Sequence, residues 1–437
     1  MAGSVTVVFV VEALGQPDDC SDLFLGELSS SLTEARLEAS LFVDASRAGY
    51  WHESAPADFR ARLKQMNVGL RLDKPLSYLA ATAGPDGTDL FRKREHRGFL
   101  DVSAHAGHIP SGLLMETWAP QAMEVIGDWG TRVVFVPHGL IENQSRPYFL
   151  AGRLHVANLG PYWIDLSFQS LLDDEGRRGL EGQIARRVEQ MPSDGGVIVL
   201  RLAGSQTSAA LEANHHQAAL GVRQLAETVR AMPRAVWQSA RQMVDRWGDI
   251  SYDVALATDF FREHAPTMAG PTLGPIRHEL GYLSPAEQLS AIARIWLESI
   301  QKGKPARNVT LRSPLPPRSG SRTDASVTAI PASDLVGVLS KVVQAVDSGR
   351  LASSVDTSQG QVAIQDLLPS LASIFAEADL TQASDVPLVK GELPIERVQP
   401  SRWHDSLISI GVATSTGSAS LTEAQQYVWT LKPTLFD

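Results

Sequence analysis

An unbroken apolar segment near the amino end, Thr6-Val7-Val8-Phe9-Val10-Val11, constrains the fold of this chain more than any other feature. A continuous apolar run of this length, rich in β-branched residues, is typical of a strand that is buried on both faces, as in the parallel sheet of an α/β fold. Glu12 follows directly. Because functional groups gather at the carboxyl ends of parallel strands, Glu12 is a candidate catalytic residue.

Segments with strand and helix patterns alternate along the next two hundred or so residues. Apolar runs predict strands at 37–44, 68–72, 132–136 and 196–202. Helical spacing of apolar residues predicts helices at 21–36, 59–66, 211–231 and 236–247. Strands alternating with helices, joined by right-handed crossovers, build a parallel sheet or a barrel.

The pattern changes after this part of the chain. Ser284-Pro285-Ala286-Glu287 is a capping box with proline at the first helical position, and it predicts a helix through Ile300. The stretch 312–323, rich in proline, serine, glycine and arginine, is typical of an exposed linker. Helices are expected at 334–346 and 365–376. We therefore expect a large α/β domain over 1–275, a first helical module with its linker over 276–323, and a second module with the tail over 324–437.

Composition excludes several classes of protein. The formal net charge of −10 argues against nucleic acid or an anionic membrane as the main partner. A single cysteine, Cys20, excludes a disulfide framework and a cysteine-built zinc site. No segment approaches the roughly 18 consecutive apolar residues of a membrane helix. No basic region precedes the first apolar run, so we expect no signal peptide and a cytoplasmic protein.

Three short motifs resemble a known family. Thr-Trp-Ala-Pro-Gln at 117–121, Arg-Val-Val-Phe-Val at 132–136 and Pro-Tyr-Phe at 147–149 look like a divergent branch of the polysaccharide deacetylases, a type of carbohydrate esterase. The tail at 428–433 resembles the end of longer, two-part bacterial members. The segment 334–376 resembles their small helical modules, which are similar to pseudomurein-binding repeats. The resemblance implies an irregular β/α barrel followed by small helical (α+β) C-terminal modules.

The same resemblance implies a metal site that this chain does not reproduce. The family has an aspartate pair after the first strand, two histidines about four residues apart, and a later histidine that acts as an acid. A divalent metal there polarises the acetyl carbonyl and activates water. At the matching positions stand Glu12 alone, then Arg71 and Asp73, and then Arg201. The resemblance therefore implies a deacetylase scaffold without its metal ligands, which is a pseudoenzyme.

Other residues offer a rewired site. His105 and His108 could bind one metal ion if Glu12 or another carboxylate converged on them, although Gly107 and Pro110 favour a loop there. His138, in Pro137-His138-Gly139, lies just past a predicted strand, where with Glu142 nearby it could serve as a general base, although a turn histidine is the default.

Aromatic residues could line a sugar-stacking cleft near the polar rim. The candidates for stacking are Trp51, Trp118, Tyr162 and Trp163. Arg71 and Asp73 are the candidate polar ligands. Tryptophan is more often a core residue, so both readings stay open.

Two functions from different classes follow. The first is a non-enzymatic carbohydrate- or protein-binding subunit of an assembly, with no cofactor and with the C-terminal modules as a docking surface for a protein partner or a homologous subunit. The alternative is a metal-dependent deacetylase or related C–N hydrolase that uses zinc or a similar ion, held by His105, His108 and Glu12, to act on an intracellular acetylated sugar.

Overall fold

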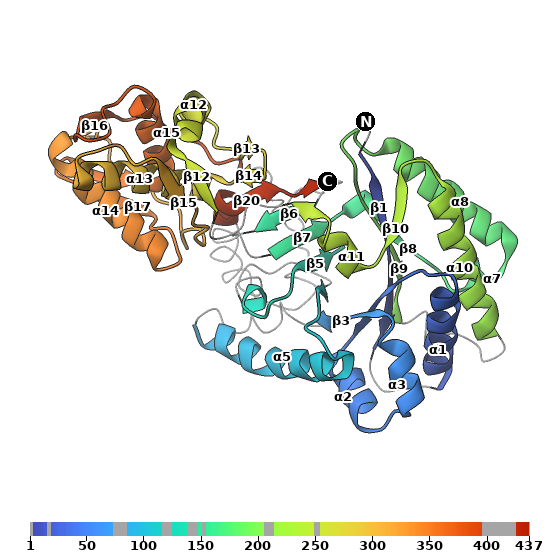
Figure 1. Cartoon of the computed structure of the whole chain (residues 1–437). Coiled ribbons are helices and arrows are strands. Elements are labelled where there is room, and N and C mark those ends of the chain that lie inside the picture. The colour runs from blue at the N-terminus through green and yellow to red at the C-terminus, as the bar shows by residue number, and fades with distance from the viewer. Residues whose placement is uncertain are drawn as a thin grey trace.

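The computed structural model describes residues 3–14, 19–72, 85–115, 125–137, 147–150, 154–204, 214–248, 254–395 and 425–436. Figure 1 shows a large sheet wrapped by helices, and beside it a smaller C-terminal region. None of the described helices is both long and apolar enough to span a membrane.

Strand β1 (Val5–Ala13) lies at the centre of the large sheet. It pairs with β9 (Gly196–Leu202) along one edge. Along its other edge β10 (Ala235–Gln238) pairs with the first half of β1, and β2 (Ser40–Val43) pairs with the second half. All three pairings are parallel, as the apolar sequence of β1 predicts. Three neighbours on one strand mean that the sheet divides at β1.

The remaining strands extend from these neighbours. Beyond β2 the order is β3, β4, β5, β7, β6 and β20, and β8 pairs with β9 at the other end. Among the described strands of this sheet, only the pairings β7–β6 and β6–β20 are antiparallel. The bounds are Asn67–Leu72 for β3, Gly112–Met115 for β4, Val133–Val136 for β5, Tyr148–Leu150 for β6, Leu154–Asn158 for β7, Trp163–Asp165 for β8 and Leu431–Pro433 for β20.

Helices cover the outer face of this sheet, and one short helix lies inside its curve (Figure 1). The outer helices are α1 (Asp19–Glu34), α2 (Ala45–Glu53), α3 (Ala57–Leu63), α5 (Pro85–Ala106), α7 (Gln169–Leu172), α8 (Asp174–Gln190) and α10 (His215–Ala231). The inner helix is α11 (Ala240–Val244). The predicted helices at 21–36, 59–66 and 211–231 therefore correspond to α1, α3 and α10.

The two faces of β1 enter different hydrophobic cores. Val7, Phe9 and Val11 belong to the outer core beneath the helices. Val8 and Val10 belong to a smaller inner core that α11 and Trp247 help to close. Because side chains alternate along a strand, Glu12 projects from the inner face as well.

The predicted helix at 236–247 is wrong. Its first residues form β10, and only α11 follows, with Ser239 as the N-cap of a capping box. The side chain of Ser40 accepts a hydrogen bond from the Ala240 N–H at 2.8 Å, which fixes the start of the helix. Val236 and Trp237 favour a strand, and a capping serine begins a new helix at the residue that follows it.

The C-terminal region has a separate core that begins at Leu256 and also contains Trp429. Its helices are α12 (Thr258–Met268), α13 (Pro285–Lys302), α14 (Ala332–Asp347) and α15 (Ile364–Phe375). Two-stranded ladders complete it: β12 (Ala255–Ala257) with β15 (Asn308–Thr310), β13 (Ile276–His278) with β14 (Gly281–Leu283), β16 (Ala329–Ile330) with β19 (Val386–Pro387), and β17 (Ser354–Thr357) with β18 (Gly360–Ala363). The capping box at Ser284 is confirmed.

The segment 312–323 is an exposed linker only in part: residues 318–320 and 322 are exposed, whereas 313–314 and 316–317 are buried. Ser313 is buried and its hydroxyl donates a hydrogen bond to Glu287. The Leu315 N–H donates to the Gly349 carbonyl, and the Leu351 N–H donates to the Leu315 carbonyl. The first half of the predicted linker is therefore anchored to the C-terminal region, and much of its second half lies at the surface.

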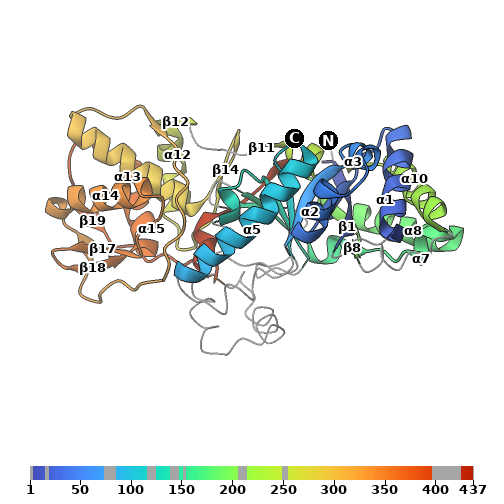
Figure 2. The same cartoon turned by 90° about the horizontal axis from the view of Figure 1, so that it is seen from below.

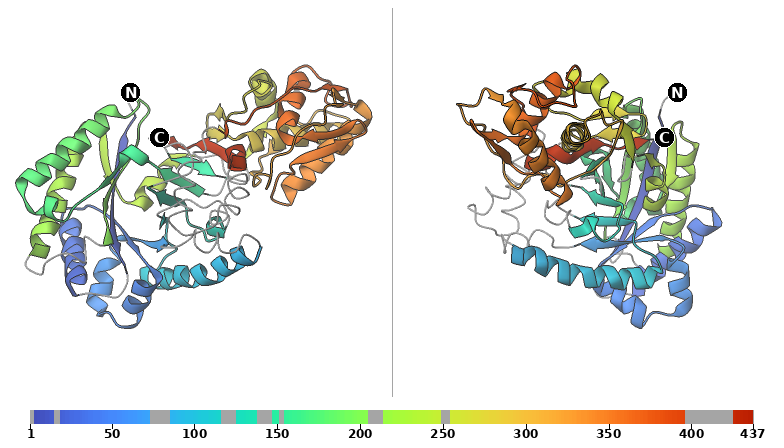
Figure 3. Two further views of the ribbon diagram at one scale, coloured as in Figure 1. Left: turned by 180° about the vertical axis from the view of Figure 1, so that it is seen from behind. Right: turned by 60° about the vertical axis from the view of Figure 1, so that its left-hand side comes forward.

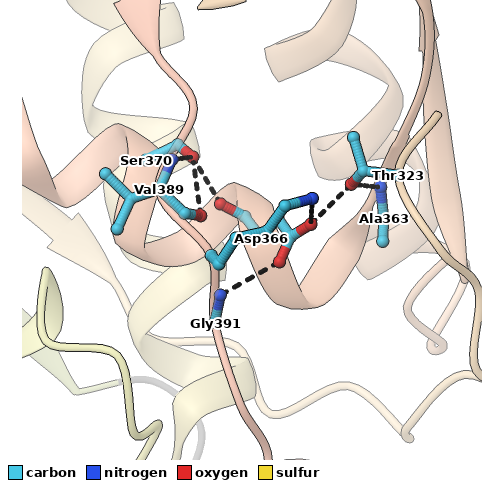
Figure 4. Close-up of polar contacts among 7 residues, drawn as sticks. Thr323, Ala363, Asp366, Ser370, Val389 and Gly391 are labelled. Carbon is cyan, nitrogen blue, oxygen red and sulfur yellow. Dashed lines mark hydrogen bonds and ion pairs between the residues drawn. The ribbon is translucent and has the colours of Figure 1, made fainter. Parts of the chain in front are cut away.

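A buried carboxylate, Asp366, holds the end of this region together (Figure 4). Its Oδ2 accepts a hydrogen bond from the Thr323 hydroxyl at 2.6 Å and contacts Lys390 Nζ at 2.9 Å. Its Oδ1 accepts from the Gly391 N–H at 3.0 Å. One side chain on α15 thus connects the segments before β17 and after β19.

The tail joins the two regions, as Figures 2 and 3 show for its red ribbon. Strand β20 pairs with β6, and β21 (Leu435–Phe436) pairs with β11 (Trp247–Gly248). Trp429, just before β20, packs in the C-terminal core. The tail is therefore part of both folded regions.

Candidate functional site

Glu12 lies at the carboxyl end of β1 and is 0% exposed. Arg201 of β9 donates from Nε to Glu12 Oε1 at 2.5 Å. Arg71 of β3 approaches from the other side, with its Nε 3.5 Å from Oε2. Each carboxylate oxygen therefore faces a guanidinium group.

The strand pattern explains why these three side chains meet. Val197 and Val199 of β9 lie in the inner core, so Arg201, two residues further along, is on the same inner face. Arg201 also pairs in register with Val10, another inner-face residue. Arg71 is held in place by its Nη1, which donates to the Leu72 carbonyl at 3.0 Å.

The charges continue from Arg201 to the end of the sheet. Arg201 Nη1 lies 3.6 Å from Asp165 Oδ1 on β8, and its guanidinium is 5.9 Å from the centre of the Trp163 ring. Trp163 Nε1 donates to the same Asp165 oxygen at 3.2 Å. The Asp165 side chain is 64% exposed, so this end of the row reaches solvent. We call Arg71, Glu12, Arg201 and Asp165 the charge row.

Burying the charged groups of the charge row costs free energy, because they lose contact with water. A buried carboxylate is tolerated when cationic partners and hydrogen bonds compensate its lost hydration, and removal of one partner typically costs about 3–5 kcal/mol. With both oxygens facing guanidinium groups, Glu12 presents no carboxylate face to a metal cation, and two positive neighbours would repel one.

The candidate metal ligands do not converge. His105 is in the last turn of α5 and is only 2% exposed; its ring lies 5.4 Å from that of Trp51, which belongs to the outer core. Glu12 is on the inner face. His108 is beyond the end of α5, with its Nδ1 3.0 Å from the Ile109 carbonyl oxygen. The structure therefore does not bring His105 and Glu12 together, because they lie on opposite faces of the sheet.

The described ranges contain no cluster of three or more His, Cys, Asp or Glu residues that could hold a metal ion. The part of the chain that the structure describes therefore does not fit the divalent metal that the sequence resemblance implies.

Trp51 is a core residue and does not line a cleft. It is 0% exposed, and its Nε1 donates to Asp22 Oδ1 at 3.3 Å. The guanidinium of Arg47 lies 5.4 Å from the centre of its ring. The other candidates, Asp73, Trp118 and His138, lie outside the described residues.

The sequence singled out Glu12 and Arg71 as candidates, but it did not predict that Arg201 pairs with Glu12 or that Asp165 pairs with Arg201. A signal was present: Arg201 is a lone charge in an apolar strand, two residues after Val199 and at its carboxyl end. Asp165 gave no such signal, because the short strand β8 has no apolar pattern.

Comparisons with known proteins gave matches among solved structures alone. No family model matches the chain, and no curated protein matches it. A structure from Mycobacterium smegmatis, described as a polysaccharide deacetylase, matches with a TM-score of 0.40 and 16% identity, over 56% of this chain and 90% of that chain.

Two further structures belong to carbohydrate esterases of family 4. One is a pseudoenzyme from Bacillus anthracis, with a TM-score of 0.31 and 10% identity over 56% of this chain and 67% of that one. The other is an esterase from Streptomyces lividans in complex with acetate, with a TM-score of 0.27 and 13% identity over 51% of this chain and 88% of that one. The function must therefore be inferred from this chain's own residues.

Proposed function

We propose that this protein is a non-enzymatic binding protein on a deacetylase-like scaffold, whose partner is a carbohydrate or another protein. The observation that carries this proposal is the placement of Glu12 between Arg201 and Arg71. Where a hydrolase of this type would hold a cation, this chain has a carboxylate already neutralised by its own arginines.

The chemistry of metal-dependent deacetylation supports the same conclusion. Such a centre needs three protein ligands and an open coordination position for water. Glu12 is the described acid on the inner face of β1, and its neighbours Arg71 and Arg201 are cations. The alternative, a C–N hydrolase with a rewired site, loses support because His105 lies across the sheet from Glu12.

The proposal also assigns a role to the C-terminal region. This region has a compact core of its own and is attached to the sheet through the tail, which suits a docking module that keeps a fixed position relative to the sheet. A cytoplasmic location and membership of an assembly remain part of the proposal and rest on the sequence.

Elemental analysis of protein purified without a histidine tag tests the proposal. We expect far less than one equivalent of zinc, nickel, cobalt or manganese per chain, both as purified and after incubation with excess metal followed by desalting. About one equivalent per chain, together with chelator-sensitive release of acetate from acetylated sugars, would overturn it.

A further inference from the structure

The hairpin of β13 and β14 carries a histidine whose hydrogen bond depends on its protonation state. The hairpin lies beside α12 in the C-terminal region (Figure 1). At its tip, the Leu280 N–H donates a hydrogen bond to Nδ1 of His278 at 3.1 Å. A backbone N–H can only donate, so Nδ1 must offer a lone pair, and the proton of the neutral ring is on Nε2. The geometry of the turn therefore fixes the tautomer of His278.

A second histidine nearby makes the opposite kind of bond. Nδ1 of His264 on α12 lies 2.9 Å from the Phe260 carbonyl oxygen, which can only accept, so this Nδ1 carries a proton. Both imidazole rings pack against the Phe260 ring, with their centres 4.3 Å from it for His264 and 4.9 Å for His278. A second ring proton leaves the hydrogen bond of His264 intact, whereas it removes the acceptor of His278.

The base of the hairpin is held independently of this bond. Gln288 Nε2 donates to the carbonyl oxygens of Gly274 and Leu283 at 2.8 and 2.9 Å. Ile276 pairs with Leu283 in the ladder, and both side chains are buried. At the tip, by contrast, Leu280 is 48% exposed. Loss of the hydrogen bond at the tip should therefore open the turn and leave the base of the ladder in place.

The charged groups on the packed elements do not hold the His278 ring in a charged state. The titratable side chains on α12 and on the hairpin are Asp259, Arg262, Glu263, His264, Arg277, Glu279 and Tyr282. Within the described ranges, none of these side chains forms a hydrogen bond or an ion pair with the His278 ring, whose partner is the Leu280 N–H. Arg262 donates instead to the carbonyl oxygens of Ala376 and Ala378.

We propose that the tip of this hairpin is a pH-sensitive switch, closed while His278 is neutral and open once its Nδ1 is protonated. Protonation turns Nδ1 from an acceptor into a donor, which then faces the N–H of Leu280, another donor. The closed turn thus binds fewer protons than the open turn, so a falling pH favours opening. Histidine side chains change their charge between about pH 5 and 8, which sets the working range. The switch is independent of the proposed function.

Nitrogen-15 NMR and amide hydrogen exchange on the full chain test the switch. At about pH 7.5 the His278 ring should be the Nε2–H tautomer. Between about pH 7.5 and 5, the protection factor of the Leu280 amide should fall about two- to tenfold, as expected for one lost hydrogen bond. The amide of Ile292, in the buried middle of α13, should keep its protection. An Nδ1–H tautomer, constant protection at Leu280, or a parallel loss at Ile292 would overturn the proposal.

Variants locate the effect. In His278→Asn the side-chain oxygen can accept from the N–H two residues on and does not titrate, so the protection of the Leu280 amide should not depend on pH. His278→Phe removes the acceptor, and protection should be low at both pH values. His264→Gln is the matched control, because it removes the other histidine beside Phe260 and should keep the pH dependence. Full pH dependence in His278→Asn, or its loss in His264→Gln, would show that His278 is not the switch.

Discussion

Two buried glutamates, one in each region, are compensated in different ways. Glu287 in the C-terminal region contacts Lys432 Nζ at 2.8 and 3.1 Å, and both side chains are 1% exposed. It also accepts hydrogen bonds from the Ser284 N–H at 2.7 Å and from the Ser313 hydroxyl. Glu12 in the sheet faces two guanidinium groups, in a row that ends at the exposed Asp165.

The two glutamates differ in the number of their cationic partners and in whether those partners connect to the surface. Glu287 balances one cation and is enclosed by neutral donors, so its role is to fasten the tail to α13. Glu12 has two cationic neighbours and belongs to a row whose far end, Asp165, is exposed to solvent. Both glutamates are buried, so burial does not distinguish them. The number of charged partners and the solvent exposure of those partners do.

The largest effect should come from breaking the enclosed pair. Lys432→Met leaves Glu287 buried without a cation, and we expect the free energy of unfolding to fall by about 3–5 kcal/mol. Urea unfolding followed by circular dichroism measures it. The double variant Glu287→Gln/Lys432→Met should recover much of the loss.

Lys302→Met is the matched control for this pair. Lys302 contacts Glu298 at 2.7 Å on the surface of α13, and its loss should cost less than about 1 kcal/mol. If Lys432→Met cost no more than this control, the buried pair would not be what fastens the tail.

A smaller effect should follow at the charge row. Glu12→Gln removes charge-assisted hydrogen bonds, and because Arg201 adjoins the exposed end of the row, we expect a loss of about 1.5–3 kcal/mol. The same urea measurement checks it. Asp165→Asn, at the exposed end, should cost under about 1 kcal/mol. A larger loss from Asp165→Asn than from Glu12→Gln would reverse the order of importance that we assign to the row.

Asp366 offers a third buried acid, with backbone and hydroxyl donors as its main partners. Asp366→Ala leaves the Gly391 N–H and the Thr323 hydroxyl without this acceptor, for a loss of about 1–3 kcal/mol. Asp366→Asn keeps an acceptor oxygen and should cost less. Chemical denaturation of both variants compares them, and equal losses would mean that the ion pair with Lys390 dominates.

The smallest effect concerns exposed acids. Hydrogen bonds from the Ser358 hydroxyl and N–H lower the pKa of Asp334 below 3.8, and those from the Thr381 hydroxyl and N–H lower the pKa of Asp379 in the same way. A carboxyl whose pKa is lower in the folded state contributes stability above its unfolded pKa and loses it as the pH falls through the folded value.

The variant Asp334→Asn/Asp379→Asn should therefore lose stability less steeply than the original chain below about pH 4. Urea midpoints across this range measure the slope. If the urea midpoint of the variant changed with pH as steeply as that of the original chain, other carboxylates would be responsible for the loss of stability in acid.

The sequence predicted features that depend on local patterns. The burial of β1 on both faces and the capping box at Ser284 follow from neighbouring residues, and both are present. The break between β10 and α11 was missed because Val236 and Trp237 have apolar spacing that suits a helix as well as a strand. The apolar spacing at 236–247 was therefore assigned to a helix, whereas its first residues form the strand β10.

Features that depend on distant residues could not be predicted. Arg201 meets Glu12 across 189 positions in the chain, and Lys432 meets Glu287 across 145. The face on which His105 lies depends on how α5 packs against Trp51, which no spacing in the histidine motif reveals. A candidate site drawn from several strands and helices therefore needs the three-dimensional structure before its members can be grouped.

The pairing of β20 with β6 also orders events during synthesis. A ribosome produces β6 early and β20 only after the entire C-terminal region, so the emerging chain carries an incomplete sheet edge throughout that interval. Open edges of this kind pair readily with other chains. The nascent protein thus carries this open edge until β20 has been made and has paired with β6.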